Sequence, residues 1–287
     1  MQHLNCVLSL IALLLFTACE TVVTDSLDMA NTDILLVVEG GVERLINGNS
    51  RRQEVRLTTT ANFLDNSPAP PVKNATVIIS DQNNSYDMIH EEDGIYVTHD
   101  LVPQVGETYT LEINWEGKAY TATDILQPVP LIDSVYIEFE EETGITDKGY
   151  FLKLNSRDPQ GVANYYHYRV YRNNQLITLP DPGASRTLVL TDEFFDGQAR
   201  LGVIPNEEVV FTLDDQATVD QIAISEEYYN FLFKIYEITG NQGLSFVGNP
   251  PPASIRGNVF SKSPDLYRAL GFFYAIEIDR QTIAVEE

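Results

Sequence analysis

The sequence predicts a mainly β protein, in which an immunoglobulin-like β-sandwich precedes a second β-rich domain that carries one short helix. Three observations predict this class. Short runs of alternating or β-branched residues recur along the chain, turn residues separate them, and one segment alone has a helical apolar period. The 287 residues suffice for two modest domains or one large one.

The first domain is expected over residues 34–127. Gly40 and Gly41 mark a bend or bulge in its first strand, and Glu116-Gly117 joins two alternating runs as a hairpin turn. Six or seven short strands at this spacing are typical of an immunoglobulin-like sandwich. Strands are expected at 34–42, 55–60, 75–80, 93–97, 108–115 and 118–123.

The second domain is expected over residues 128–287. Pro128 and Pro130 interrupt any strand ladder and favour an extended connector, so the boundary is placed there. Beyond it, strands are expected at 134–140, 150–155, 164–172, 175–177, 187–190, 199–203, 208–213, 256–260 and 269–278.

One helix is expected near residues 225–238. Ser225 can cap its first turn, where Glu226 and Glu227 complement the helix dipole, and Gly240 can end it. Apolar residues from Tyr228 onward recur on one face, which favours a packed helix over an aromatic platform for a ligand.

The N-terminus predicts an exported lipoprotein. The apolar run from Val7 to Phe16 has the length of a signal-peptide core and is too short to span a bilayer. The tetrapeptide that ends in Cys19 resembles a bacterial lipobox, so residues 1–18 are expected to be removed and Cys19 to be lipidated. Residues 19–33 are then a tether. The alternative is an ordinary secretory signal.

The net charge limits the classes of partner that the protein is expected to bind, and the cysteine content limits its disulfides. The formal net charge of −24 disfavours nucleic acid and anionic headgroups, so the lipid on Cys19 has to hold the protein to its membrane. Because Cys6 lies in the removed segment, no disulfide is expected within the mature chain.

No catalytic residue or metal site is assigned, and we expect no enzyme. His90, His99 and His167 fit no zinc motif, and His167 is expected to be a satisfied structural histidine. Nucleophile-elbow and phosphate-loop motifs are missing from the sequence. A hydrolase that uses paired carboxylates stays open, because acidic residues are abundant.

No cofactor is assigned either, although Ca²⁺ is the metal most compatible with so acidic a composition. Three acidic stretches offer possible calcium ligands, and a solvated acidic surface is the preferred interpretation of each. They are 81–87, 138–142 and 192–197.

Several short motifs resemble, in order, those of a family of Bacteroidota lipoproteins, domain of unknown function 4249. The motifs cover nearly all of the mature chain. They are LVVEG (36–40), NSPAPPV (66–72) with ATV (75–77), DGIY (93–96), GETYTL (106–111), PLIDSV (130–135), NYY (164–166) with RVYRN (169–173), DEFFDG (192–197), SEEYY (225–229) and NPP (249–251).

The resemblance implies an outer-membrane lipoprotein, on the periplasmic face or the cell surface, without established catalytic residues. It also implies an accessory role beside a TonB-dependent receptor in nutrient uptake. The alternative function is that of a structural or adhesive surface protein, and the third hypothesis is a hydrolase of glycan or peptide. Ser26, in an Asp-Ser-Leu motif within the tether, is a candidate for O-glycosylation, ahead of Ser134.

Overall fold

The computed structural model describes residues 34–48, 50–61, 68–142, 147–177, 188–240, 255–263 and 268–286. Apart from Ile34, these residues belong to one compact unit, Leu35–Ala61 with Ser67–Glu287. The signal peptide, the tether, Cys19 and Ser26 lie outside the described residues.

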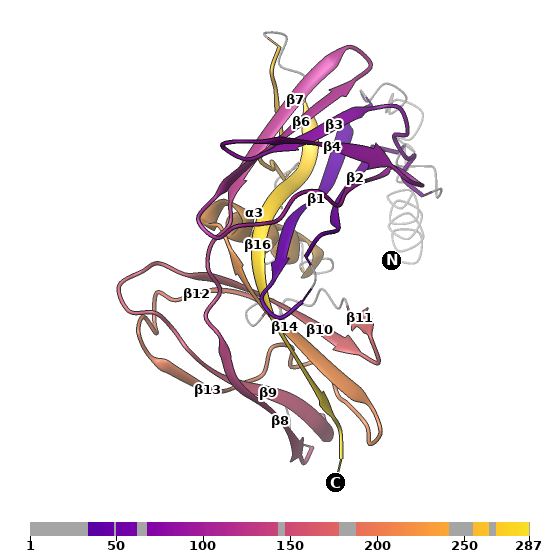
Figure 1. Cartoon of the computed structure of the whole chain (residues 1–287). Coiled ribbons are helices and arrows are strands. Elements are labelled where there is room, and N and C mark those ends of the chain that lie inside the picture. The colour runs from indigo at the N-terminus through magenta and orange to yellow at the C-terminus, as the bar shows by residue number, and fades with distance from the viewer. Residues whose placement is uncertain are drawn as a thin grey trace, which may run out of the picture. The chain divides into compact units, whose positions relative to one another are not determined.

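Most strands join one large sheet (Figure 1). Its strand order is β11-β10-β14-β16-β1-β2-β5-β4-β3-β6-β7-β15, and β12 pairs with β10. The bounds are β1 Leu36–Leu45, β2 Gln53–Thr59, β3 Thr76–Ser80, β4 Ser85–His90, β5 Ile95–Thr98, β6 Thr108–Trp115, β7 Lys118–Ile125, β10 Tyr165–Arg172, β11 Gln175–Ile177, β12 Val189–Thr191, β14 Gln216–Ile224, β15 Phe260–Ser261 and β16 Ala269–Ala284.

A second sheet has the order β13-β9-β8, and helix α3 completes the described elements. Their bounds are β8 Ile132–Glu140, β9 Gly149–Arg157, β13 Ala199–Val203 and α3 Glu226–Gly240. A large sheet, a smaller sheet and a single helix among the described residues confirm the mainly β class. The immunoglobulin-like assignment and the boundary at residue 127 stay predictions. No helix of the described chain is long and apolar enough to cross a membrane.

Strand β16 takes part in two different strand pairings. Its residues 269–278 run parallel to β1, while its residues 277–284 pair antiparallel with β14. In Figure 1 the yellow β16 accordingly passes beside β1 and continues along β14. Strands from the first and second halves of the chain are therefore joined through this one strand.

The side chains of β16 also serve two cores, because successive residues of a strand point to opposite faces. Phe273 and Ala275 belong to the core that the strands of the first half surround. Phe272, Ile276 and Ile278 belong to the core beneath α3, together with Tyr228 and Leu232. A third core lies between β8–β9 and β10–β14, and includes Leu154, Phe211 and Val219.

The glycines of β1 serve close strand contact, and they do not form the bulge that is one of the two features expected there from the sequence. The pairing of β1 with β2 and β16 runs through Gly40 and Gly41 without a register shift. A Cβ on Gly41 would lie 1.8 Å from the carbonyl oxygen of Tyr274, and one on Gly271 would lie 1.9 Å from that of Val38. Only glycine fits where the two backbones approach so closely.

The strand predictions were wrong at four places. Residues 208–213 form a single bridge, between Phe211 and Tyr150, and residues 256–260 contribute only the start of β15. Strands β4 and β14 were not expected. The polar residues of β14 hid it, since Asp220 and Gln221 are fully buried there.

Candidate functional site

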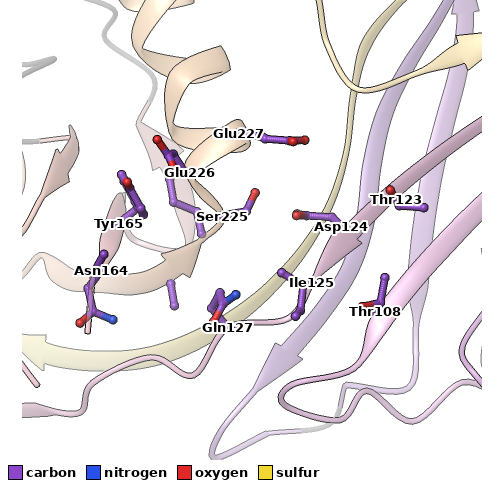
Figure 2. A pocket seen from close by; sticks show the side chains of 13 residues that line it. Thr108, Thr123, Asp124, Ile125, Gln127, Asn164, Tyr165, Ser225, Glu226 and Glu227 are labelled. Atoms are coloured by element: carbon purple, nitrogen blue, oxygen red, sulfur yellow. The ribbon is translucent and has the colours of Figure 1, made fainter. Parts of the chain in front are cut away.

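A pocket of about 540 Å³ lies where β7 ends, β10 begins and β14 leads into α3 (Figure 2). The β7 side contributes Thr123, Asp124 and Ile125, and the helix side contributes Ser225, Glu226 and Glu227. Thr108, Gln127, Asn164 and Tyr165 complete the polar lining. The pocket thus brings together residues from distant parts of the sequence.

Asp124 is the buried carboxylate of this pocket. Its side chain is 7% exposed, and its Oδ2 accepts a hydrogen bond from the backbone N–H of Ala275 at 2.9 Å. Burial raises the pKa of Asp124 to about 6, against the opposing effect of hydrogen bonds from Ala275 and from the Ser225 side chain. The group therefore titrates near pH 6, and it is mostly charged at neutral pH.

The first turn of α3 supplies the other two carboxylates. Ser225 Oγ accepts the N–H of Tyr228 at 3.2 Å, so the predicted helix cap is confirmed. Glu226 and Glu227 are exposed, and Figure 2 shows the carboxylate of Glu227 on the same side of the pocket as Asp124. The sequence assigned both glutamates to the helix dipole alone; the structure also places them at a pocket.

Tyr165, the first residue of β10, lines the pocket on the side of helix α3. Tyr165 hydrogen-bonds to Glu226, and its ring packs on Tyr229 with 5.3 Å between centroids. Burial, and then the charge of Glu226, raise the pKa of Tyr165. Its hydroxyl therefore stays protonated at neutral pH and is able to donate a hydrogen bond.

The charged side chains in the described lining of the pocket are all acidic. Among the described residues around the pocket, three are carboxylates and none is Lys, Arg or His. Hydroxyl and amide groups provide both hydrogen-bond donors and acceptors. Such a pocket attracts a small polar molecule that carries positive charge and repels phosphate or carboxylate groups.

The three histidines lie outside the pocket. His167 is buried in β10, where burial lowers its pKa to about 3 and keeps the ring neutral. The expectation of a satisfied histidine was wrong, because Nδ1 has no hydrogen-bond partner among the described residues. His90 Nε2 accepts the N–H of Gly94 at 3.4 Å, and His99 is exposed.

The acidic stretches weighed for calcium separate in the structure. Asp81 accepts the N–H groups of Asn83 and Asn84 within a turn. Glu138 and Glu140 both lie 2.6 Å from Lys153 Nζ, so this stretch faces a cation of the protein itself.

Asp192 and Asp196 lie beside Asp158, which the sequence did not single out. Ser134, the weaker glycosylation candidate, is exposed on β8, and its Oγ accepts a hydrogen bond from Asn155.

Comparison with known proteins gives a family but no activity. A search of curated proteins finds no match. The profile of the family described as Domain of unknown function (DUF4249) matches residues 21–282, which is most of the chain. The protein therefore belongs to the DUF4249 family.

Proposed function

We propose that this protein is a non-enzymatic binding component of the cell envelope, anchored to the outer membrane by lipid on Cys19, that assists a TonB-dependent receptor in nutrient uptake. The observation that carries the binding role is the pocket beside Asp124, where three carboxylates meet hydroxyl and amide groups without a basic side chain in the described lining. The lipid anchor and the receptor rest on the lipobox and the family resemblance.

The ligand class follows from the charge of the pocket. An ammonium group placed beside Asp124 would neutralise a buried carboxylate that has no basic side chain beside it in the described lining, while Glu226, Glu227 and Tyr165 accept or donate further hydrogen bonds. The proposed ligand is thus a small molecule with at least one amine, such as a polyamine or a lysine-containing peptide.

Binding of a cationic probe tests the pocket. We expect spermidine or a dilysine peptide to bind the full-length lipidated protein in detergent, measured by titration calorimetry at low ionic strength. Asp124→Asn should weaken this binding by about tenfold, equivalent to roughly 1.4 kcal/mol. Asp87→Asn, which removes the same charge from an exposed strand position, should leave it unchanged. Equal affinities for the two variants would contradict the proposed pocket.

Co-purification tests the receptor. After mild cross-linking of whole cells, the tagged protein should bring down an outer-membrane barrel of the TonB-dependent class. Its recovery without such a barrel, together with a loss of cell attachment on deletion, would support the adhesive alternative instead.

A further inference from the structure

Three aspartates from two segments of the chain, residue 158 and the turn 192–197, lie close together next to the small sheet. Asp158 follows β9, Asp192 follows β12, and Asp196 lies in the turn before β13. One carboxylate oxygen of each lies within 4.8 Å of the others. Two oxygens on opposite sides of one Ca²⁺ ion are about 4.8 Å apart, at about 2.4 Å from the ion each, so three oxygens within this limit are close enough to bind one ion.

Two of these carboxylates are buried without a counter-ion. Asp158 is 2% exposed and Asp192 is 5% exposed. In the described part of the chain, no Lys, Arg or His lies within 4.0 Å of the three carboxylates. Burying an unpaired carboxylate is costly, so this arrangement needs a compensating positive charge.

Among the described residues of this region, the buried arginine is Arg200, and it contacts aromatic side chains rather than the three carboxylates. The guanidinium of Arg200 lies over the rings of Phe195 and Tyr166, 4.6 Å and 4.9 Å from their centroids. Its Nη2 donates to the hydroxyl of Tyr168 at 2.7 Å. Arg200 therefore supports the aromatic wall of the cluster and forms no ion pair with its carboxylates.

Hydrogen bonds hold the three carboxylates in place but leave oxygens available. Asp158 accepts from the Tyr166 hydroxyl and from Gly197 N–H, the latter at 3.0 Å. Asp192 Oδ2 accepts the N–H of Asn164 at 2.8 Å, and Asp196 Oδ1 accepts that of Gly161 at 2.6 Å. Each of these carboxylates keeps lone pairs that a cation can use.

A fourth candidate ligand is the amide oxygen of Asn164. This side chain is 8% exposed, and its Oδ1 has no hydrogen-bond partner among the described residues. Asn164 lies directly opposite Asp192. The backbone N–H of Asp192 donates to the carbonyl oxygen of Asn164, and the next pair in the antiparallel register is Tyr165 with Thr191. Directly opposite residues present their side chains on the same face.

Two further observations show on which face of the strand the Asn164 side chain lies. Tyr166, two residues along the strand from Asn164, reaches Asp158 with its hydroxyl. Figure 2 shows the side chains of Asn164 and Tyr165 pointing in opposite directions, and Tyr165 packs toward α3. The side chain of Asn164, which also borders the pocket beside Asp124, therefore lies on the strand face that it shares with Tyr166 and Asp192, where its unpartnered amide oxygen is available to a cation.

We infer that Asp158, Asp192, Asp196 and the amide oxygen of Asn164 form a Ca²⁺ site. All four ligands are oxygens, which hard cations prefer, and Ca²⁺ accepts a larger and less regular ligand set than Mg²⁺ does. Because Asp196 is exposed, water is able to complete the coordination of the ion on that side. The ion links β9 of the small sheet to the β10–β12 edge of the large one, so its role is to hold the two sheets together.

Direct binding measurements test the site. The full-length lipidated protein, stripped with chelator, should bind one Ca²⁺ per chain in titration calorimetry. It should also bind one Tb³⁺ whose emission is sensitised by tyrosine excitation, since Tyr166 contacts a ligand. Asp192→Asn and Asp196→Asn should each weaken Ca²⁺ binding by about tenfold or more. Asp124→Asn and Asp87→Asn should bind Ca²⁺ as the unchanged protein does.

Each other outcome overturns the inference. If the unchanged protein does not bind Ca²⁺ at millimolar concentration, or if folded Asp196→Asn binds it equally well, the site is wrong. Equal displacement by Mg²⁺ at the same concentration would overturn the assignment to calcium. Circular dichroism verifies folding of each variant, and Asp196→Asn alters an exposed residue. Because Asp124→Asn affects only the amine-binding pocket, failure of one proposal is distinguishable from failure of the other.

Discussion

Asp279 of β16 accepts a hydrogen bond from the backbone N–H of Ile132 at 2.7 Å, across 147 positions of sequence. Glu277, two residues earlier on the same strand, accepts one from Val129 at 2.8 Å. Both carboxylates are buried and both bind the proline-containing connector. The connector between the two halves of the chain is therefore fixed along the strand that both halves use.

Removing one of these carboxylates should destabilise the fold. Asp279→Ala leaves the N–H of Ile132 buried and unpaired, which should lower the free energy of unfolding by about 1–3 kcal/mol. Urea denaturation followed by circular dichroism measures this. Asp133→Ala, at an exposed position next to Ile132, is the control and should change it by less than about 0.5 kcal/mol. Equal losses in the two variants would show that the hydrogen bond does not hold the connector.

Asp124 should make stability fall as the pH rises. Its pKa is about 6 in the folded protein and 3.8 in a model group, so the folded state binds the proton more tightly. Between pH 4 and 6 the protein should lose up to about 3 kcal/mol through this group. Asp124→Asn should not show this loss. The measurement is the difference in urea midpoint between the two proteins across that range, and a constant difference would contradict the raised pKa.

His167 should act in the opposite direction. Burial lowers the pKa of His167 to about 3 from its ordinary value of 6.5, so protonation favours the unfolded state, and stability is lost as the pH falls below 6.5. His167→Phe removes this sensitivity and should make the protein more resistant to acid than the unchanged chain is. Comparing each variant with the unchanged protein separates the contributions of Asp124 and His167, because the two groups change the stability in opposite directions as the pH falls. An identical acid midpoint for His167→Phe would refute the assignment.

Gly41→Ala should be strongly destabilising. The added Cβ would lie 1.8 Å from the carbonyl oxygen of Tyr274, so β1 and β16 would have to separate. We expect a loss of roughly 2–4 kcal/mol in thermal or urea unfolding. Gly117→Asn is a matched control, since a Cβ there meets nothing within 4 Å and asparagine tolerates the positive φ of that hairpin. Similar losses in both variants would exclude the close strand contact as the cause.

Local patterns in the sequence predicted much of the fold. The hairpin at Glu116-Gly117 and the helix capped by Ser225 are confirmed, because short-range turn and capping chemistry determines both. Strand β14 was missed since Asp220 and Gln221 break its apolar pattern. Both are buried only because Arg280 and Tyr168 on neighbouring strands satisfy them.

The sites depended on distant contacts and were not predictable in the same way. Asp124 meets Ser225 only through the packing of β7 against the start of α3. Asp158 joins Asp192 only when the small sheet packs beside β12. The run 192–197 is recognisable from the sequence as a calcium candidate. Asp158, which lies beside it, is not, because acidic residues are so frequent along the chain.

The parallel pairing of β1 with β16 also orders events during synthesis. Residues 36–45 leave the ribosome long before residues 269–278, yet β1 has β16 as its neighbour on one side. The high contact order of this pairing makes its formation slow. Until β16 arrives, a nascent chain exposes the unpaired edge of β1, which is a template for intermolecular strand pairing. That edge therefore stays open to strand pairing with other chains until residues 269–278 are in place.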